Sequence, residues 1–194
     1  MFAKICGITN AGDALAAIEH GAGALGFNFC PASPRYIAPN ELQHWIGTLP
    51  AAAWKVGVFV NESPARVTEI SEMLHLDVIQ LHGDEPPEDF PEHLRVWKAV
   101  QVHADFTFAT LDRYPAEAVL LDGPYGGSGQ NFDWSLASGH SRKVIVAGGL
   151  DAANVRLAIE RMRPWGVDAC SRIESSPGKK DRVRMAQFLK AALS

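Results

Sequence analysis

Two residues that could transfer protons each stand at the end of a short apolar run. Cys6 closes the run FAKIC and Asp122 closes the run AVLLD. A cysteine becomes a base when a helix N-terminus or a nearby cation lowers its pKa from about 8.5. A carboxyl group that burial keeps protonated is a general acid. We therefore predict that Cys6 is a base and Asp122 an acid. The alternatives are a small buried apolar cysteine and an Asp-Gly turn.

Two neighbouring segments near the C-terminus have the features of an anion site. Gly148 and Gly149 end one apolar run, and Ser171 and Arg172 follow the next one. Bare glycine backbone can approach an anion, and adjacent loops at the end of a β/α barrel commonly bind phosphate. We predict phosphate binding by these four residues. The alternatives are a tight turn at the glycines and a helix cap at Ser171.

Two further segments could contact a substrate. Arg35, in the sequence Ser33-Pro34-Arg35, could hold a carboxylate through two parallel hydrogen bonds, or it could be a solvated surface arginine. The glycine-rich residues 126–130 lack the Gly-Lys-Ser/Thr of a nucleotide-binding loop. This segment is expected to be either a lid beside the acid or an ordinary flexible connection.

Eight strand candidates position these residues, with amphipathic segments between them. The strands are expected at residues 2–6, 23–28, 54–60, 78–82, 95–100, 118–122, 143–147 and 166–170, and helices at 13–20, 64–74, 151–162 and 181–192. Ser63-Pro64 and Asp151 are predicted helix starts. The helices after strands four and six have the weakest pattern. Such alternation predicts right-handed βαβ units and a parallel sheet.

The fold class that fits this alternation is α/β, as a single (β/α)8 TIM barrel over residues 1–194. An open doubly wound sheet is the rival, but its usual glycine-rich turn is missing after the first strand. In a barrel, polar residues at alternate strand positions point into the lumen. Lys4 and Asp168 do so on strands one and eight, which become neighbours on closure. A buried ion pair between them is therefore predicted.

Composition narrows the partners and the compartment. The formal net charge is −4 and no basic stripe is present, so nucleic acid is not an expected partner. With 47% hydrophobic and 21% charged residues, the composition is that of a soluble globular protein rather than a membrane protein. Three cysteines without CxxC spacing argue against disulfides and a metal site. The N-terminus has no signal-peptide pattern, so a cytoplasmic protein is expected, either a monomer or a homodimer.

The chain resembles the phosphoribosylanthranilate isomerase family over almost its whole length. The motifs that carry the resemblance, in the family's order, are Lys4-Ile5-Cys6-Gly7-Ile8-Thr9, Leu25-Gly26-Phe27, Ser33-Pro34-Arg35, Val56-Gly57-Val58-Phe59, Gln80-Leu81-His82-Gly83, Leu121-Asp122, Gly127-Ser128-Gly129, Phe132-Asp133-Trp134, Ala147-Gly148-Gly149-Leu150 and Gly166-Val167-Asp168. Any one of these motifs is weak evidence, whereas ten in order are specific.

The resemblance implies a cofactor-free Amadori rearrangement in tryptophan biosynthesis, in which N-(5-phosphoribosyl)anthranilate becomes 1-(2-carboxyphenylamino)-1-deoxyribulose 5-phosphate. Asp122 matches the family's acid and Cys6 its base. Arg35 matches the residue near the anthranilate moiety. Gly148, Gly149 and the Ser171 region match the phosphate cradle, and Gln80 and His82 would line the pocket.

One departure from the family and two alternative functions remain. Where the family usually has Ser-Ser-Gly-Val-Glu, this chain has Cys170-Ser171-Arg172-Ile173-Glu174, which leaves the phosphate contacts of Arg172 open. A related histidine-pathway isomerase on the same barrel would be expected to use two aspartates, and Cys6 argues against it. A non-catalytic barrel that binds a phosphorylated ligand would be expected to lack the acid or the base.

Overall fold

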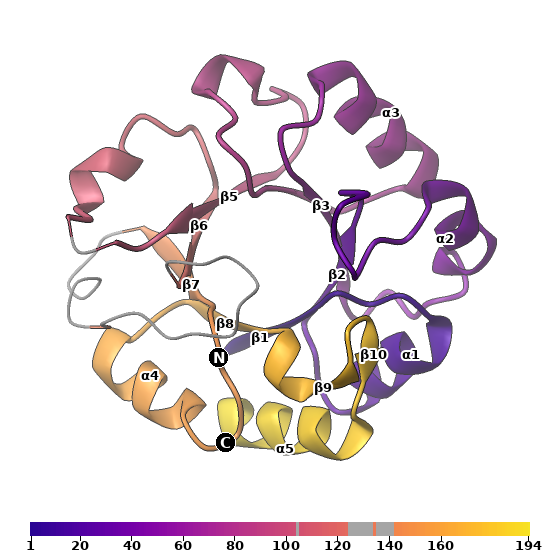
Figure 1. Ribbon diagram of the computed structural model, residues 1–194, viewed down its shortest axis with the longest axis vertical. Helices are drawn as coiled ribbons and strands as arrows, with labels where there is room; N and C mark the ends of the chain where they lie inside the picture. Colours follow the sequence, from indigo (N-terminus) through magenta and orange to yellow (C-terminus); the bar gives the residue numbers. More distant parts are fainter. Residues whose placement is uncertain (104, 124–133, 135–141) are drawn as a thin grey trace.

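The chain forms a closed barrel of eight parallel strands in sequence order, as Figure 1 shows. The computed structural model describes residues 1–103, 105–123, 134 and 142–194. The barrel strands are β1 (Phe2–Cys6), β2 (Ala24–Asn28), β3 (Trp54–Phe59), β4 (Val78–Leu81), β5 (Val96–Gln101), β6 (Ala118–Asp122), β7 (Lys143–Val146) and β8 (Gly166–Ala169). Their bounds lie within one or two residues of those predicted, and the (β/α)8 fold is confirmed.

The helices surround the barrel unevenly (Figure 1). They are α1 (Ala11–Glu19), α2 (Pro39–Ile46), α3 (Pro64–Leu74), α4 (Val155–Met162) and α5 (Arg182–Leu193), with short 3₁₀ turns at Pro87–Asp89, Phe108–Leu111 and Ser171–Ile173. In the described parts of the connections after β4 and β5, only such turns occur. Prolines at 86, 87 and 91 disfavour a helix after β4, because each lacks a backbone N–H donor. The predicted sixth helix falls mainly on residues outside those described.

The predicted start of α4 is wrong by four residues. The Asp151 side chain accepts a hydrogen bond from the Ala153 N–H, and the Asn154 side chain accepts one from the Asp151 N–H. These bonds form a separate turn, so the helix begins at Val155. The other predicted start is correct, because the Ser63 side chain caps α3 at the Arg66 N–H. In the part of the chain that the structure describes, no helix is long and apolar enough to cross a membrane.

Aromatic rings close the amino-terminal end of the barrel. Phe2 stacks on Trp165 with ring centroids 4.5 Å apart, and Trp54 and Trp97 pack beside them. Small and branched residues such as Ala118 fill the lumen above this layer. The amino end of the lumen is therefore packed core, and space for a ligand remains at the carboxyl ends of the strands.

A buried ion pair lies where the barrel closes. β1 pairs with β8 in a register that sets Lys4 opposite Asp168. The Lys4 Nζ lies 3.0 Å from the Asp168 Oδ1, with the two side chains 0% and 8% exposed. Burial lowers the pKa of Lys4, but the combined attraction of Asp168 and Cys6 outweighs it and raises that pKa above its ordinary value. The ion pair predicted from strand parity is confirmed.

Removing one member of this pair should destabilise the protein strongly. We expect Lys4→Met or Asp168→Asn alone to lower the free energy of unfolding by about 3–5 kcal/mol, because each leaves a buried polar or charged partner uncompensated. The double variant Lys4→Met/Asp168→Leu should lose less than the sum of the single losses. Urea denaturation at neutral pH measures these differences.

Arg66→Met provides the control for loss of a cation. Arg66 pairs with Glu69 on the surface, where the two side chains are 43% and 64% exposed. Its loss should change the free energy of unfolding by less than about 1 kcal/mol. If Lys4→Met falls in that same range, the ion pair does not stabilise the barrel as argued.

Candidate active site

A cavity of about 560 Å³ opens at the carboxyl ends of the barrel strands. It lies opposite the aromatic layer at the amino end. The residues that line it include Cys6, Asn28, Cys30, Arg35, His82, Gln101, Asp122, Gly148, Gly149, Asp168, Cys170, Ser171 and Arg172. The predicted acid, base and phosphate residues thus share one cavity, as the strand-end positions implied.

Gln80 is the predicted site residue that does not line this cavity. It is 1% exposed and lies two residues before His82, deeper in the barrel. The Gln80 side-chain amide nitrogen lies 3.1 Å from the His82 Nδ1. The two side chains are therefore within hydrogen-bond distance of each other. Gln80 thus contacts the His82 ring from the barrel interior and helps to fix its orientation.

Asp122 is held at the end of β6 by two contacts. Its Oδ1 accepts a 2.8 Å hydrogen bond from the Gly123 N–H. Its Oδ2 lies 3.5 Å from the His82 Nε2. The carboxyl group is buried, with 6% of the residue exposed. A contact chain from Gln80 through His82 therefore fixes the predicted acid on the cavity wall.

Cys6 lies close to the backbone of the adjacent strand and to a cation. A Cβ atom added at Gly26 would lie 2.9 Å from the Cys6 Sγ and 2.9 Å from the Lys4 Nζ, so only glycine fits there. A hydrogen bond with Cys170 lowers the pKa of Cys6 most. Burial opposes this effect, while Lys4 and Lys180 lower the pKa further. The result is a pKa well below that of an ordinary thiol, as a thiolate base requires.

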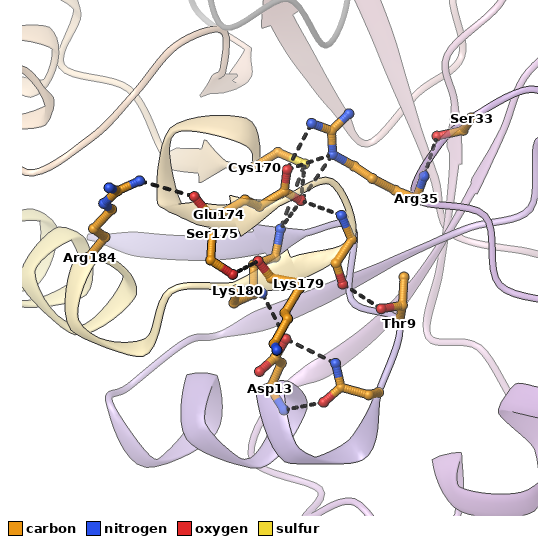
Figure 2. A network of polar contacts seen from close by, with 12 residues as sticks. Thr9, Asp13, Ser33, Arg35, Cys170, Glu174, Ser175, Lys179, Lys180 and Arg184 are labelled. Carbon is orange, nitrogen blue, oxygen red and sulfur yellow. Dashed lines mark hydrogen bonds and ion pairs between the residues drawn. The ribbon is translucent and has the colours of Figure 1, made fainter.

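Arg35 holds a carboxylate through two parallel contacts, but the carboxylate belongs to the protein itself. Its Nε lies 3.0 and 3.1 Å from the two Glu174 carboxylate oxygens, and its Nη2 lies 2.9 Å from Oε2. Lys180 donates a further 2.8 Å bond to the same carboxylate. Figure 2 shows Arg35 and Lys180 converging on Glu174, with one guanidinium nitrogen of Arg35 outside these bonds.

A short hairpin after β8 carries Glu174 and Lys180. Its strands are β9 (Glu174–Ser176) and β10 (Lys179–Lys180), which pair antiparallel. The Lys180 N–H donates a 2.8 Å bond to the Asp13 carboxylate on α1, and the Thr9 hydroxyl donates to the Gly178 carbonyl. Figure 2 shows these links between the hairpin and α1. The loop after β8 is thereby anchored to the segment that follows Cys6.

The predicted phosphate residues lie on two adjacent loops. Gly148 and Gly149 follow β7 with φ of 81° and 63°, a left-handed conformation that favours glycine. Ser171 begins a 3₁₀ turn after β8. The Arg172 Nη1 lies 3.7 Å from the Asp151 Oδ2, with the Arg172 side chain 51% exposed. Arg172 therefore lies at the cavity mouth and joins the two loops.

Some site features escaped prediction from the sequence. Asn28 and Gln101 line the cavity from the ends of β2 and β5, and the strand-end rule that identified Asp122 would have found them. The strand-end rule could not identify Glu174, because this residue belongs to the hairpin after β8 and not to the end of a barrel strand. The predicted lid at residues 126–130 lies outside the described residues. Among the described residues, no group of three or more His, Cys, Asp or Glu could hold a metal ion.

Comparison with known proteins identifies the family. A family model described as N-(5'-phosphoribosyl)anthranilate (PRA) isomerase matches residues 3–191. The N-(5'-phosphoribosyl)anthranilate isomerase of Solibacter usitatus is 58% identical, across 99% of this chain and 97% of its own length. That of Thermotoga maritima is 42% identical, across 97% of each chain.

Solved structures agree with this comparison. The phosphoribosyl anthranilate isomerase of Thermus thermophilus superimposes with a TM-score of 0.94 at 36% identity, covering 100% of this chain and 98% of that one. Another such isomerase, in complex with reduced 1-(o-carboxyphenylamino)-1-deoxyribulose 5-phosphate, gives a TM-score of 0.87 at 38% identity, with the same coverage. The chain belongs to the N-(5'-phosphoribosyl)anthranilate isomerase family.

Proposed function

We propose that this chain converts N-(5-phosphoribosyl)anthranilate to 1-(2-carboxyphenylamino)-1-deoxyribulose 5-phosphate in tryptophan biosynthesis, with Cys6 as base and Asp122 as acid. Membership of the isomerase family supports the reaction. The observation that supports the two roles is that both side chains line one cavity, beside the glycine loop after β7. This is an aldose–ketose isomerisation, and no cofactor enters its steps.

The steps follow from the two proton positions. Asp122, in its protonated form, gives its proton to the ring oxygen of the ribose. The bond between that oxygen and C1′ breaks, and the nitrogen lone pair forms an iminium. Cys6, as the thiolate, then removes the C2′ proton. The electron pair of the broken C2′–H bond neutralises the iminium and gives an enolamine. The enolamine ketonises to the product.

The charged ends of the substrate would lie on opposite parts of the cavity wall. Gly148, Gly149 and Ser171 offer backbone and hydroxyl groups to the phosphate, and Arg172 adds a charge at the mouth. Arg35 engages Glu174 through Nε and Nη2, so Nη1 is the nitrogen that would reach the anthranilate carboxylate. A volume of about 560 Å³ is within the range of roughly 300–1,000 Å³ usual for small-molecule sites.

The alternatives fit less well. An isomerase that uses two aspartates would have an aspartate where this chain has Cys6. The family comparisons also favour the anthranilate substrate. A non-catalytic barrel has no use for a thiol whose pKa lies well below its ordinary value. The partner is therefore a phosphorylated small molecule. A relative from Thermotoga maritima is described as dimeric, while the oligomeric state and cytoplasmic location of this chain stay predictions.

Separate replacement of the base and the acid tests the proposed roles. We expect Cys6→Ala and Asp122→Asn each to lower kcat by roughly 10²–10⁴-fold, because each removes one proton-transfer group. Binding of the reduced product analogue should stay within a few-fold, since neither residue belongs to the phosphate loops. Steady-state kinetics and titration calorimetry measure the two quantities.

Asp112→Asn is the control for loss of a carboxylate, because Asp112 is exposed and does not line the cavity. It should leave kcat unchanged. Growth of a tryptophan auxotroph lacking this step, when supplied with the chain, tests the substrate. Full turnover in both Cys6→Ala and Asp122→Asn would exclude this mechanism, and failure to support growth would exclude the substrate.

Arg172 tests the phosphate end of the cavity. We expect Arg172→Ala to raise KM roughly threefold to tenfold with little change in kcat, because an exposed charged contact binds substrate and transition state equally. Arg66→Ala on the surface of α3 is the matched control and should leave KM unchanged. An unaltered KM in Arg172→Ala would show that Arg172 does not bind the phosphate.

A further inference from the structure

A second thiol lies beside the proposed base. β1 and β8 pair with Ile5 opposite Ala169, so Cys6 and Cys170, each one residue further on, end neighbouring parallel strands. Both residues line the cavity, and this register places their thiol side chains next to each other on the lumen side of the two strands. A Cβ atom added at Gly7 would lie 3.0 Å from the Cys170 Sγ, so this sulfur packs against the chain where it leaves Cys6.

The neighbours of Cys170 decide which way its hydrogen points. The Lys180 Nζ lies 3.8 Å from the Cys170 Sγ and can only donate, so the sulfur accepts from it. The Glu174 Oε1 lies 3.9 Å away, as Figure 2 shows. That oxygen already has nearer N–H donors, at 2.8 Å from Lys180 and 3.0 Å from Arg35. The Cys6 sulfur is therefore the better acceptor for the Cys170 S–H.

The charges around the two sulfurs decide which of them loses its proton. The groups that face Cys6 are Lys4, Arg35, Asp168, Cys170 and Lys180, with Asp122 on the same cavity wall. The hydrogen bond with Cys6 and burial raise the pKa of Cys170, while the same bond lowers the pKa of Cys6. Lys4, in hydrogen-bond contact with the Cys6 sulfur, adds to this difference. Cys170 accordingly stays a thiol when Cys6 is a thiolate.

We propose that Cys170 is a positioning residue for the base: its thiol donates a hydrogen bond to the Cys6 sulfur and holds that sulfur as a thiolate facing the cavity. The inference rests on the proposed role of Cys6. It assigns to Cys170 no proton transfer to the substrate. Its effect is confined to how much of Cys6 is ionised at a given pH and to where the sulfur points.

Replacement of Cys170 should move the ionisation of Cys6. We expect Cys170→Ala to raise the pKa of Cys6 by about one unit, because the thiolate loses a hydrogen-bond donor. The rise of kcat/KM with pH follows deprotonation of the base, so this limb should move to higher pH by the same amount. Well below the pKa, kcat/KM should fall about tenfold, and the loss should disappear at high pH. Cys170→Ser keeps a donor and should restore most of the original profile.

One readout makes the test independent of turnover. The rate of alkylation of Cys6 by iodoacetamide, followed by peptide mass across a range of pH, gives its pKa directly. Cys30→Ala is the matched control, because it removes another thiol from the same cavity wall and Cys30 is absent from the groups that face Cys6. The alkylation pKa of Cys6 in this variant should equal that of the unsubstituted chain.

An unchanged Cys6 pKa in Cys170→Ala would overturn the proposal, and so would a loss of kcat/KM that is equal at every pH. Failure of Cys170→Ser to restore the profile, in a folded variant, would overturn the role of the donor. The alkylation measurement requires no catalysis. If the Cys6→Ala variant shows that Cys6 is not the base, the hydrogen bond between the two thiols is still tested by itself.

Discussion

The pairing of β1 with β8 sets both the closure of the barrel and the chemistry of its rim. In one register it buries Lys4 against Asp168 and brings Cys6 beside Cys170 two residues further along. Side chains alternate between the two faces of a strand, so a shift of β1 by one residue would turn Lys4 and Cys6 away from the lumen and from their partners on β8. The ion pair and the thiol pair are therefore consequences of a single strand alignment.

A thiolate in a buried site needs cations, and those cations must themselves be neutralised. Lys4 faces Asp168, while Arg35 and Lys180 share the Glu174 carboxylate. Each cation is thus held within reach of the sulfurs without being left as an isolated buried charge. Glu174 keeps its own negative charge, because Arg35 and Lys180 outweigh the burial that raises its pKa. Each cation near the two sulfurs is thus paired with a carboxylate, and the site carries charges of both signs rather than a positive charge alone.

Strand positions were predictable from the sequence, whereas depth and long-range partners were not. Parity and barrel closure sufficed to predict the Lys4 and Asp168 pair. The same alternation of side chains along β4 placed Gln80 in the lumen. Alternation predicts the face on which a side chain lies but not its depth in the barrel, and Gln80 is buried one layer below the rim. The sequence left Arg35 as either a carboxylate clamp or a surface arginine, because its partner Glu174 reaches it through a hairpin that no local pattern predicts.

The thin side of the barrel shows why so short a chain can build this site. Among the described residues, 3₁₀ turns take the place of helices after β4 and β5. Side chains pack there instead: Phe90 stacks on Tyr114, and Arg142 donates to the carbonyls of Leu111 and Tyr114. The full helices α1, α4 and α5 instead flank β1, β7 and β8 (Figure 1). These strands carry the proposed base and the phosphate loops, where a shift of about 1 Å would cost most in rate. Among the described residues, these three helices support the strands that carry the proposed base and the phosphate loops, while β4 and β5 lead to His82 and Gln101.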